Sequence, residues 1–400
     1  MPVTKCFFSS AVTVVFLLMQ SFSYATTYYF STSGSDANNG LSISRPKQSL
    51  SAATTLMTGG NVILFKRGDI WYIPMDSVNL SGKSNFTLDA YGTGDKPVIA
   101  GMALLDGTWT YTGSNNIWKS TDPRFTYVHR VFVNGVSRIS LLNKNGNSDN
   151  ISDLDSLDEY FYDHGAVKAL YIKTNSSTVA PTGVEVIPSR GGYWQGARTL
   201  YMKNASNIII KNIEFRGGSV QTNMLIEAPG SNITIDNCIV GRCSRNGITV
   251  ANNSNNMDVV QNINITNCVV DKGWTIAENN VKPNMVLEGD GIAFHNGINT
   301  GLIKGNTVRN FGHEAIGLFA YSGANAYGVK RVKVEMNDVA AGNSAYMHAF
   351  SIIALEGKAM YNIVKRNYFH HFSSGCTIGG EVNFIFSNIF STVTASPNIQ

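Results

Sequence analysis

The chain has 400 residues, of which 31 are Lys or Arg and 27 are Asp or Glu, so its formal net charge is only +4. A charge this small gives no support to specific nucleic-acid binding. The low charged fraction of 14%, together with 38 glycines and many Asn and Ser residues, is typical of a turn-rich β protein.

Residues 1–25 have the three parts of a secretory signal peptide. Lys5 supplies the positive charge, residues 11–19 form an apolar run too short to span a bilayer, and residues 23–25 read Ser-Tyr-Ala, a small-x-small cleavage site. No later apolar run is long enough for a transmembrane helix. We therefore expect a secreted chain, extracellular or periplasmic, that is monomeric and free of the membrane. An uncleaved N-terminal anchor is the alternative.

Residues 26–103 are expected to form an N-terminal cap and the first turns of a repetitive fold. Residues 28–30 are strand-like, and residues 49–57 can form a short helix whose N-cap is Ser49 or Ser51. A stack of repeats must cover its first open turn, and a short amphipathic helix does so.

Three stretches of this region resemble sequences found in a known group of proteins. Residues 29–40 read Tyr-Phe-Ser-x-x-Gly-Ser-Asp-x-x-x-Gly, residues 65–69 read Phe-Lys-Arg-Gly-Asp, and residues 90–99 read Ala-Tyr-Gly-Thr-Gly-x-x-Pro-Val-Ile. They resemble secreted right-handed parallel β-helix proteins of the pectin-lyase-like superfamily, and the resemblance extends over residues 28–390. That superfamily includes many polysaccharide lyases and glycoside hydrolases. The resemblance therefore implies a polysaccharide-degrading enzyme.

Residues 104–200 are expected to interrupt the repetitive fold. Residues 130–135 and 169–172 are strand-like, whereas residues 146–158 are polar and acidic. We interpret the segment as a β insertion or as irregular first turns. It is rich in aromatic residues, which we expect mainly to pack the insertion. Exposed aromatic faces that stack on sugar rings are the alternative.

Residues 201–400 repeat one phrase, in which an asparagine stands between apolar residues. The asparagines recur every 21 to 39 residues, as stacked supersecondary units do. They are Asn212, Asn237, Asn267, Asn306, Asn337, Asn367 and Asn388. Short alternations of β-branched residues, without helical periodicity, indicate strands that pair in parallel between units about 4.8 Å apart. An Asn at one corner of every unit would form a side-chain ladder.

This pattern predicts an all-β fold, a right-handed parallel β-helix (a solenoid) with an N-terminal cap helix and a β insertion. The rival is an antiparallel propeller or sandwich, which would need tight hairpin turns every 8–12 residues or so, and these are lacking. Cys238 and Cys268 both follow a repeat asparagine, so they should be neighbours in adjacent units. They would form either a disulfide or two free thiols.

The longest gap between repeat asparagines, from Asn267 to Asn306, points to a site. It contains residues 273–288, which have no strand pattern, and long loops in a compact array are usually functional or disordered. The inward isoleucines of three neighbouring units can be aligned at Ile248, Ile292 and Ile316. The residue two places earlier is then Asn246, Asp290 or Glu314, so these form one column.

Two carboxylates in adjacent units repel when both are charged, so one pKa should rise, as a general acid requires. Glycoside hydrolysis uses such a pair, and hydrolysis by Asp290 and Glu314, with His313 beside them, is the favoured interpretation. His348 would extend the column by one unit, and His295 lies on the outward side of its strand. The remaining candidates for substrate contact are Lys304, Arg309 and Trp274.

The site is similar in place to that of the β-helix polygalacturonases, which carry Gly-Asp-Asp and, one turn later, Gly-His-Gly. Here residues 289–291 read Gly-Asp-Gly and residues 312–314 read Gly-His-Glu. The second Asp of the family motif maps onto Asp290. Gly289 replaces the first Asp, His313 is one residue out of register, and no Arg-Ile-Lys motif follows. The resemblance therefore implies a substrate other than polygalacturonan.

Other interpretations stay open. A uronate lyase would bind Ca²⁺ through the carboxylates of Glu288, Asp290 and Glu314. Its base would be Lys304, Arg309 or His313. A non-catalytic carbohydrate-binding or adhesin β-helix would need no acid–base pair, and carboxylates at turn corners often only accept hydrogen bonds from backbone N–H groups.

Overall fold

The computed structural model describes residues 25–122, 125–141, 150–157, 159–163, 165, 167–189, 197–218, 222–254, 257–272, 289–320, 327–340, 351–372, 376–393 and 398–399. The predicted signal peptide, apart from Ala25, lies outside these residues. Within them, no helix is both long and apolar enough to cross a membrane.

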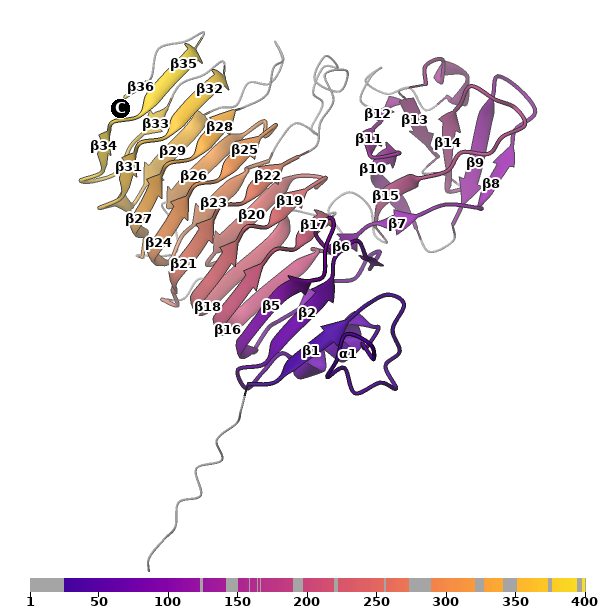
Figure 1. Ribbon diagram of the computed structural model, residues 1–400. Helices are drawn as coiled ribbons and strands as arrows, with labels where there is room; N and C mark the ends of the chain where they lie inside the picture. Colours follow the sequence, from indigo (N-terminus) through magenta and orange to yellow (C-terminus); the bar gives the residue numbers. More distant parts are fainter. Residues whose placement is uncertain are drawn as a thin grey trace, which may run out of the picture.

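Two long sheets of parallel strands wind along one axis and enclose a common core (Figure 1). Sheet A contains β1 (Thr27–Phe30), β2 (Val62–Lys66), β4 (Val78–Asn79), β5 (Ser84–Tyr91), β16 (Leu200–Lys211), β18 (Thr222–Asp236), β20 (Asn246–Ala251), β21 (Val260–Thr266), β23 (Ile292–His295), β24 (Ile298–Lys304), β26 (Glu314–Ala320), β27 (Val329–Glu335), β29 (Ser351–Gly357), β30 (Ala359–Met360), β31 (Ile363–Lys365), β33 (Thr377–Ile378), β34 (Phe384–Phe386) and β36 (Asn398–Ile399). Sheet B contains β3 (Ile70–Tyr72), β6 (Val98–Gly101), β17 (Glu214–Gly217), β19 (Ile239–Gly241), β22 (Val269–Asp271), β25 (Thr307–Arg309), β28 (Asp338–Ala340), β32 (Tyr368–Phe372) and β35 (Ile389–Val393).

Each strand of these sheets pairs in parallel with its counterpart one turn, or rung, further along the chain. Ile208 pairs with Ile233, and Ile233 pairs with Ile263; all three are fully buried. Burying one such side chain contributes about 2 kcal/mol, more than the roughly 1 kcal/mol of a single hydrogen bond, so apolar stacking sets the register. The predicted parallel β-helix is confirmed. The antiparallel propeller or sandwich is wrong, because every described pairing in sheets A and B is parallel.

The repeat asparagines form two sets, not the single ladder that the sequence suggested. Asn306, Asn337 and Asn367 lie inside the solenoid, at 1–2% exposure. Asn337 Oδ1 accepts hydrogen bonds from Asn306 N (2.9 Å) and Nδ2 (3.0 Å), and Asn337 Nδ2 donates to the carbonyl oxygen of Ile303 (3.0 Å). The same contacts repeat between Asn337 and Asn367, so each rung of this ladder satisfies groups of the rung before it.

The other set stands one residue earlier in its rungs. Asn212, Asn237 and Asn267 have left-handed backbone conformations, with φ of +61°, +48° and +54°. In later rungs that corner is held by Gly305, Met336, Arg366 and Ser387. The offset escapes a sequence pattern because asparagine suits both roles: it tolerates a positive φ, and its amide can bond between rungs.

Cys238 and Cys268 take the interior position of the early rungs. The Cys238 N–H donates to Cys268 Sγ (3.5 Å), and the Cys268 N–H donates to Asn306 Oδ1 (2.9 Å). The two cysteines are therefore neighbours, as predicted, but both are free thiols. Burial raises the pKa of the Cys238 thiol.

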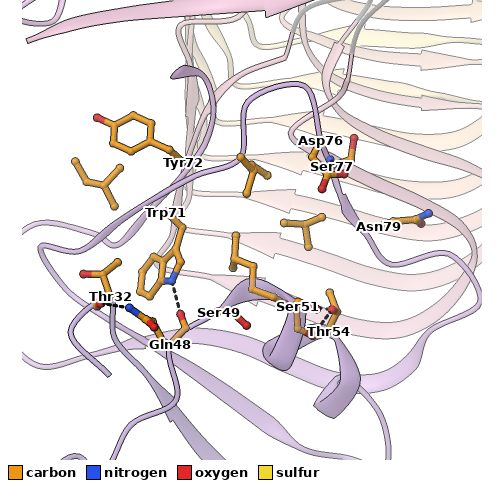
Figure 2. A pocket seen from close by; sticks show the side chains of 14 residues that line it. Thr32, Gln48, Ser49, Ser51, Thr54, Trp71, Tyr72, Asp76, Ser77 and Asn79 are labelled. Atoms are coloured by element: carbon orange, nitrogen blue, oxygen red, sulfur yellow. Dashed lines mark hydrogen bonds between the residues drawn. The ribbon is translucent and has the colours of Figure 1, made fainter. Parts of the chain in front are cut away.

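A cap helix covers the first rung. Helix α1 (Leu50–Leu56) begins after Ser49, whose Oγ accepts a hydrogen bond from Ala52 N (3.0 Å). A cavity of about 590 Å³ lies between this helix and residues 70–79 (Figure 2). Its lining contains one carboxylate, Asp76, and no second carboxylate, so it does not offer the carboxyl pair that glycoside hydrolysis uses.

Two small sheets form a module inserted between β6 and β16, and we call it the inserted module. One sheet contains β7 (Ala103–Leu104), β10 (Tyr127–Val133), β11 (Val136–Ser137) and β15 (Val184–Ser189). The other contains β8 (Trp109–Tyr111), β9 (Ile117–Thr121), β12 (Ile139–Ser140), β13 (Glu159–Tyr162) and β14 (Ala169–Lys173), with the 3₁₀ helix η1 (Ile151–Asp153). Tyr160 and Tyr162 are buried in its core, so these aromatic residues pack the insertion.

A buried charge cluster joins the inserted module to the solenoid. Glu185 of β15 accepts a hydrogen bond from Tyr72 Oη (2.9 Å) and forms an ion pair with Arg242 Nη1 (2.6 Å). Arg216 Nη1 lies 3.9 Å from the same carboxylate and also pairs with Glu214. Because Glu185 is 6% exposed, removing its cationic partners would leave a buried charge uncompensated.

We expect Asn337→Ala to lower the free energy of unfolding by about 2–3 kcal/mol, because it leaves the Asn306 N–H and the Ile303 carbonyl unsatisfied in the core. Asn237→Gly is the matched control. Its side chain is exposed and glycine adopts the same positive φ, so we expect a change below about 1 kcal/mol. Urea unfolding measures both. Equal losses would contradict the assignment of two separate ladders.

Candidate active site

The predicted column of polar residues is present. Ile248 pairs with Ile292 and Ile292 pairs with Ile316, so the alignment made from the sequence is correct. Asp290 therefore stands two residues before its paired isoleucine, and Glu314 occupies the equivalent place at the start of β26. Both lie at the corner where a rung passes from sheet B to sheet A.

Two glycines allow the rungs to approach closely at this corner. Gly289 has a φ of +143°, and a Cβ there would lie 2.3 Å from the carbonyl oxygen of Arg245. A Cβ on Gly291 would lie 2.4 Å from the carbonyl oxygen of Ala315. The Gly-Asp-Gly sequence thus places a single carboxylate between neighbouring backbones, where only glycine fits on either side.

The main-chain N–H and carbonyl of Asp290 are both hydrogen-bonded to the preceding rung. Its N–H donates to Asn246 Oδ1 (3.0 Å), and its carbonyl oxygen accepts from Gly247 N (2.9 Å). In the next rung, Gly291 N donates to the Glu314 carbonyl (2.9 Å). The spacing of the two carboxylates is therefore set by the backbone ladder rather than by a loop.

The two acidic side chains converge on one histidine. His313 Nδ1 lies 2.8 Å from Asp290 Oδ1, and Glu314 Oε2 is in contact with the same ring nitrogen. One ligand atom from each of the three residues lies within 4.8 Å of the others. Asp290 and Glu314 are 5% and 3% exposed, whereas the His313 side chain is 38% exposed. The carboxylates are thus nearly dry, and the imidazole faces solvent.

A second histidine and a phenylalanine complete the cluster. His295 Nε2 lies 3.6 Å from Asp290 Oδ2, which confirms that His295 is on the outward side of β23. The Phe319 ring packs edge-on against His295 (4.9 Å between centroids) and lies 6.5 Å from the His313 ring. A Cβ on Gly317 would meet the Phe319 ring at 2.1 Å, so this glycine makes room for the ring. No motif or repeat in the sequence pointed to Phe319.

The two histidines determine the ionisation of Asp290. Burial by itself would raise the pKa of this carboxyl, but hydrogen bonds and ring charges from His295 and His313 hold the pKa below its ordinary value. The sequence predicted a raised pKa for one member of the pair. Asp290 is not that member.

The described residues do not match a calcium site. Calcium takes about six to eight oxygen ligands, whereas this cluster offers two carboxylates and a ring nitrogen. Glu288, the third carboxylate expected in the lyase interpretation, lies outside the described residues.

Two of the expected substrate contacts have other partners. Lys304 Nζ, at the end of β24, lies 3.5 Å from Glu335 on β27. Arg309, at the end of β25, forms an ion pair with Asp338 on β28 (3.3 Å). Both belong to strands other than β23 and β26, and no contact joins them to the cluster within the described part of the chain.

Two more of these candidates, Trp274 and His348, lie outside the described residues. In the next rung, Ser351 holds the place that corresponds to Glu314, since these two residues pair.

Comparisons with known proteins identify the fold. No family model and no curated protein matches the sequence. A solved structure described as a glycoside hydrolase matches over 92% of this chain and 96% of its own, at 12% identity and a TM-score of 0.55. The pectate lyase Pel9A matches over 95% and 79%, at 14% identity and a TM-score of 0.50. A GH136 lacto-N-biosidase from Eubacterium ramulus matches over 92% and 57%, at 15% identity and a TM-score of 0.48.

These likenesses show that the chain has the parallel β-helix fold of these solved structures. Hydrolases and lyases both appear among the matches, so the fold does not distinguish the two chemistries. The choice between them rests on the side chains of the site.

The lowered pKa of Asp290 predicts how pH affects stability. An ionised carboxylate with a depressed pKa stabilises the fold fully above its ordinary pKa of 3.8, and this contribution is lost as pH falls through the lowered value. We expect the difference in Tm between wild type and Asp290→Asn to shrink as pH falls below that ordinary value. Thermal melts across an acid pH series measure it. A difference that grows with acidity would mean a raised pKa and contradict the prediction.

Proposed function

We propose that the protein is a carbohydrate-active enzyme that hydrolyses glycosidic bonds of a polysaccharide, with Asp290 and Glu314 as its two carboxyl groups. The observation that carries the proposal is the convergence of two buried carboxylates on a single imidazole nitrogen. The fold, which glycoside hydrolases and polysaccharide lyases share, supports the substrate class.

The hydrogen count at His313 Nδ1 favours one protonated and one ionised carboxyl group in the cluster. His313 Nδ1 carries at most one hydrogen, yet carboxylate oxygens of both Asp290 and Glu314 face it. Two ionised carboxylates this close and this dry would repel strongly, so a further proton on the pair is favourable. The lowered pKa of Asp290 keeps that group ionised. We therefore assign the proton, and the role of general acid, to Glu314.

The spacing favours retention of configuration. Oxygens of the two carboxyl groups lie within 4.8 Å, nearer to the roughly 5–5.5 Å of retaining enzymes than to the roughly 6.5–9.5 Å of inverting ones. In this mechanism an Asp290 oxygen attacks the anomeric carbon while Glu314 protonates the departing glycosidic oxygen. Glu314, now ionised, takes a proton from water, which attacks the same carbon and releases Asp290.

One observation favours a second candidate, β-elimination on a uronate polymer. His313 is the most exposed group of the cluster, and the buried Asp290 holds its Nδ1. An imidazole oriented in this way is a suitable base for the acidic C5 proton of a uronate. The electron pair of the C5–H bond would form the C4=C5 double bond as the C4–O bond breaks, and the departing oxygen would take a proton from water.

We also propose that the protein is exported. The basis is the arrangement of residues 1–25, in which a lysine, a short apolar run and a small-x-small site follow one another. An extracellular location suits a polysaccharide substrate.

Product analysis tests the main proposal. Neutral and uronate polysaccharides would be digested, and new reducing ends and the ultraviolet absorbance of unsaturated products would be measured together. We expect reducing ends without absorbance, and a loss of about 10²- to 10⁴-fold in rate for Glu314→Gln, because general acid catalysis is removed. Asp290→Asn should lose at least as much. Asp338→Asn, an exposed carboxylate on β28, is the control and should retain activity.

The same assay separates the alternatives. Unsaturated products that disappear in His313→Gln, but persist in Glu314→Gln, would establish elimination and exclude the hydrolytic assignment. Insensitivity to chelators would agree with the absence of a calcium ligand set among the described residues. No turnover on any polymer, with binding that weakens gradually along one face, would indicate a non-catalytic scaffold.

A further inference from the structure

One buried side chain of the inserted module reaches the rungs that carry the candidate site. Arg130, on β10, is 2% exposed. Its Nη1 donates to the carbonyl oxygens of Cys243 (2.9 Å) and Lys272 (2.7 Å), and its Nη2 donates to Ser137 Oγ (2.8 Å). The guanidinium also lies 4.7 Å from the ring centroid of Phe132. These contacts join positions more than one hundred residues apart in the chain.

The two carbonyl groups lie where the chain leaves sheet B. Gly241 and Asp271, the last residues of β19 and β22, are paired. Cys243 is the second residue after Gly241, and Lys272 directly follows Asp271. Arg130 therefore supplies hydrogen bonds at a corner where the regular pairing of sheet B ends.

The path from this corner to the site is short. Asn246 is the third residue after Cys243, and Asn246 Oδ1 accepts the N–H of Asp290 (3.0 Å). The next residue, Gly247, donates its N–H to the Asp290 carbonyl (2.9 Å). One side-chain group and one main-chain group that hold Asp290 therefore come within four residues of Cys243.

We propose that Arg130 is a positioning residue for the candidate site, through which the inserted module fixes the corner that orients Asp290. Its effect on turnover rests on the proposed function, whereas its effect on the backbone does not. Arginine suits this role because its planar fork can donate in several fixed directions while staying charged and buried. Lysine has a single charged nitrogen and cannot reproduce the fork.

A purely structural explanation needs a separate control. The inserted module is also attached through Glu185 and its partners, so weakening that attachment is distinct from releasing the corner. Arg216 belongs to the Glu185 cluster, and its side-chain partners are Glu185 and Glu214. Arg216→Gln therefore loosens the same module without removing a bond to Cys243 or Lys272.

Hydrogen–deuterium exchange on the full chain is the first test, and it needs no substrate. We expect Arg130→Gln to speed exchange in a peptide covering residues 289–295 by about tenfold, and Arg130→Lys to have a smaller effect. Arg216→Gln should leave that peptide unchanged. Unchanged exchange in Arg130→Gln, or equal effects of Arg130→Gln and Arg216→Gln, would overturn the proposal. If Arg130→Gln does not fold, the comparison of Arg130→Lys with Arg216→Gln decides.

Kinetics on the best substrate form the second test. A misplaced Asp290 should lower kcat of Arg130→Gln by about ten- to a hundredfold with little change in KM, because geometry at the reacting atoms is lost rather than binding. Arg130→Lys should recover part of kcat, and Arg216→Gln should change it by less than about twofold. A change in KM alone would contradict a positioning role. If no polysaccharide is cleaved, the proposed function fails, and the exchange experiment still decides the role of Arg130.

Discussion

The register between successive rungs, which apolar stacking in the core sets and the backbone hydrogen bonds follow, governs the rest of this structure. It places Ile248, Ile292 and Ile316 over one another in the core, and it thereby places Asp290 and Glu314 over one another at the edge. Neither carboxylate is positioned by a flexible connection. Because a parallel rung repeats about every 4.8 Å, side chains at equivalent places are always close enough to interact, whatever the length of chain between them.

This constraint explains why the site is electrostatically unusual. The fold brings two acids to adjacent rungs and buries both, an arrangement that would be unfavourable without compensation. The two histidines compensate the two carboxyl groups unequally. The Asp290 carboxylate contacts both imidazole rings, whereas the Glu314 carboxyl contacts His313. The difference in surroundings is what allows two chemically similar groups to take different roles.

Much of this could be predicted from the sequence, for a physical reason. Strands have a period of two, so aligned isoleucines fix which neighbours point outward, and the column of Asp290 and Glu314 followed correctly. The asparagine repeat was misread by one residue, because the same side chain serves both an exposed left-handed corner and a buried ladder. Arg130 and Phe319 could not be found from sequence motifs, because their contacts are with residues on other strands of the fold. Lys304 was assigned to the site from its nearness in sequence, but its strand faces other neighbours.

The independence of the spacing between Asp290 and Glu314 from the connecting segments has an evolutionary consequence. Asp290 and Asn246 are held together by a hydrogen bond between neighbouring rungs, although they lie 44 residues apart in the chain. Segments of this kind can lengthen, shorten or change composition without moving Asp290 relative to Glu314. For the proposed hydrolase, a lineage with this architecture could therefore change the polymer it recognises while Asp290 and Glu314 keep their spacing.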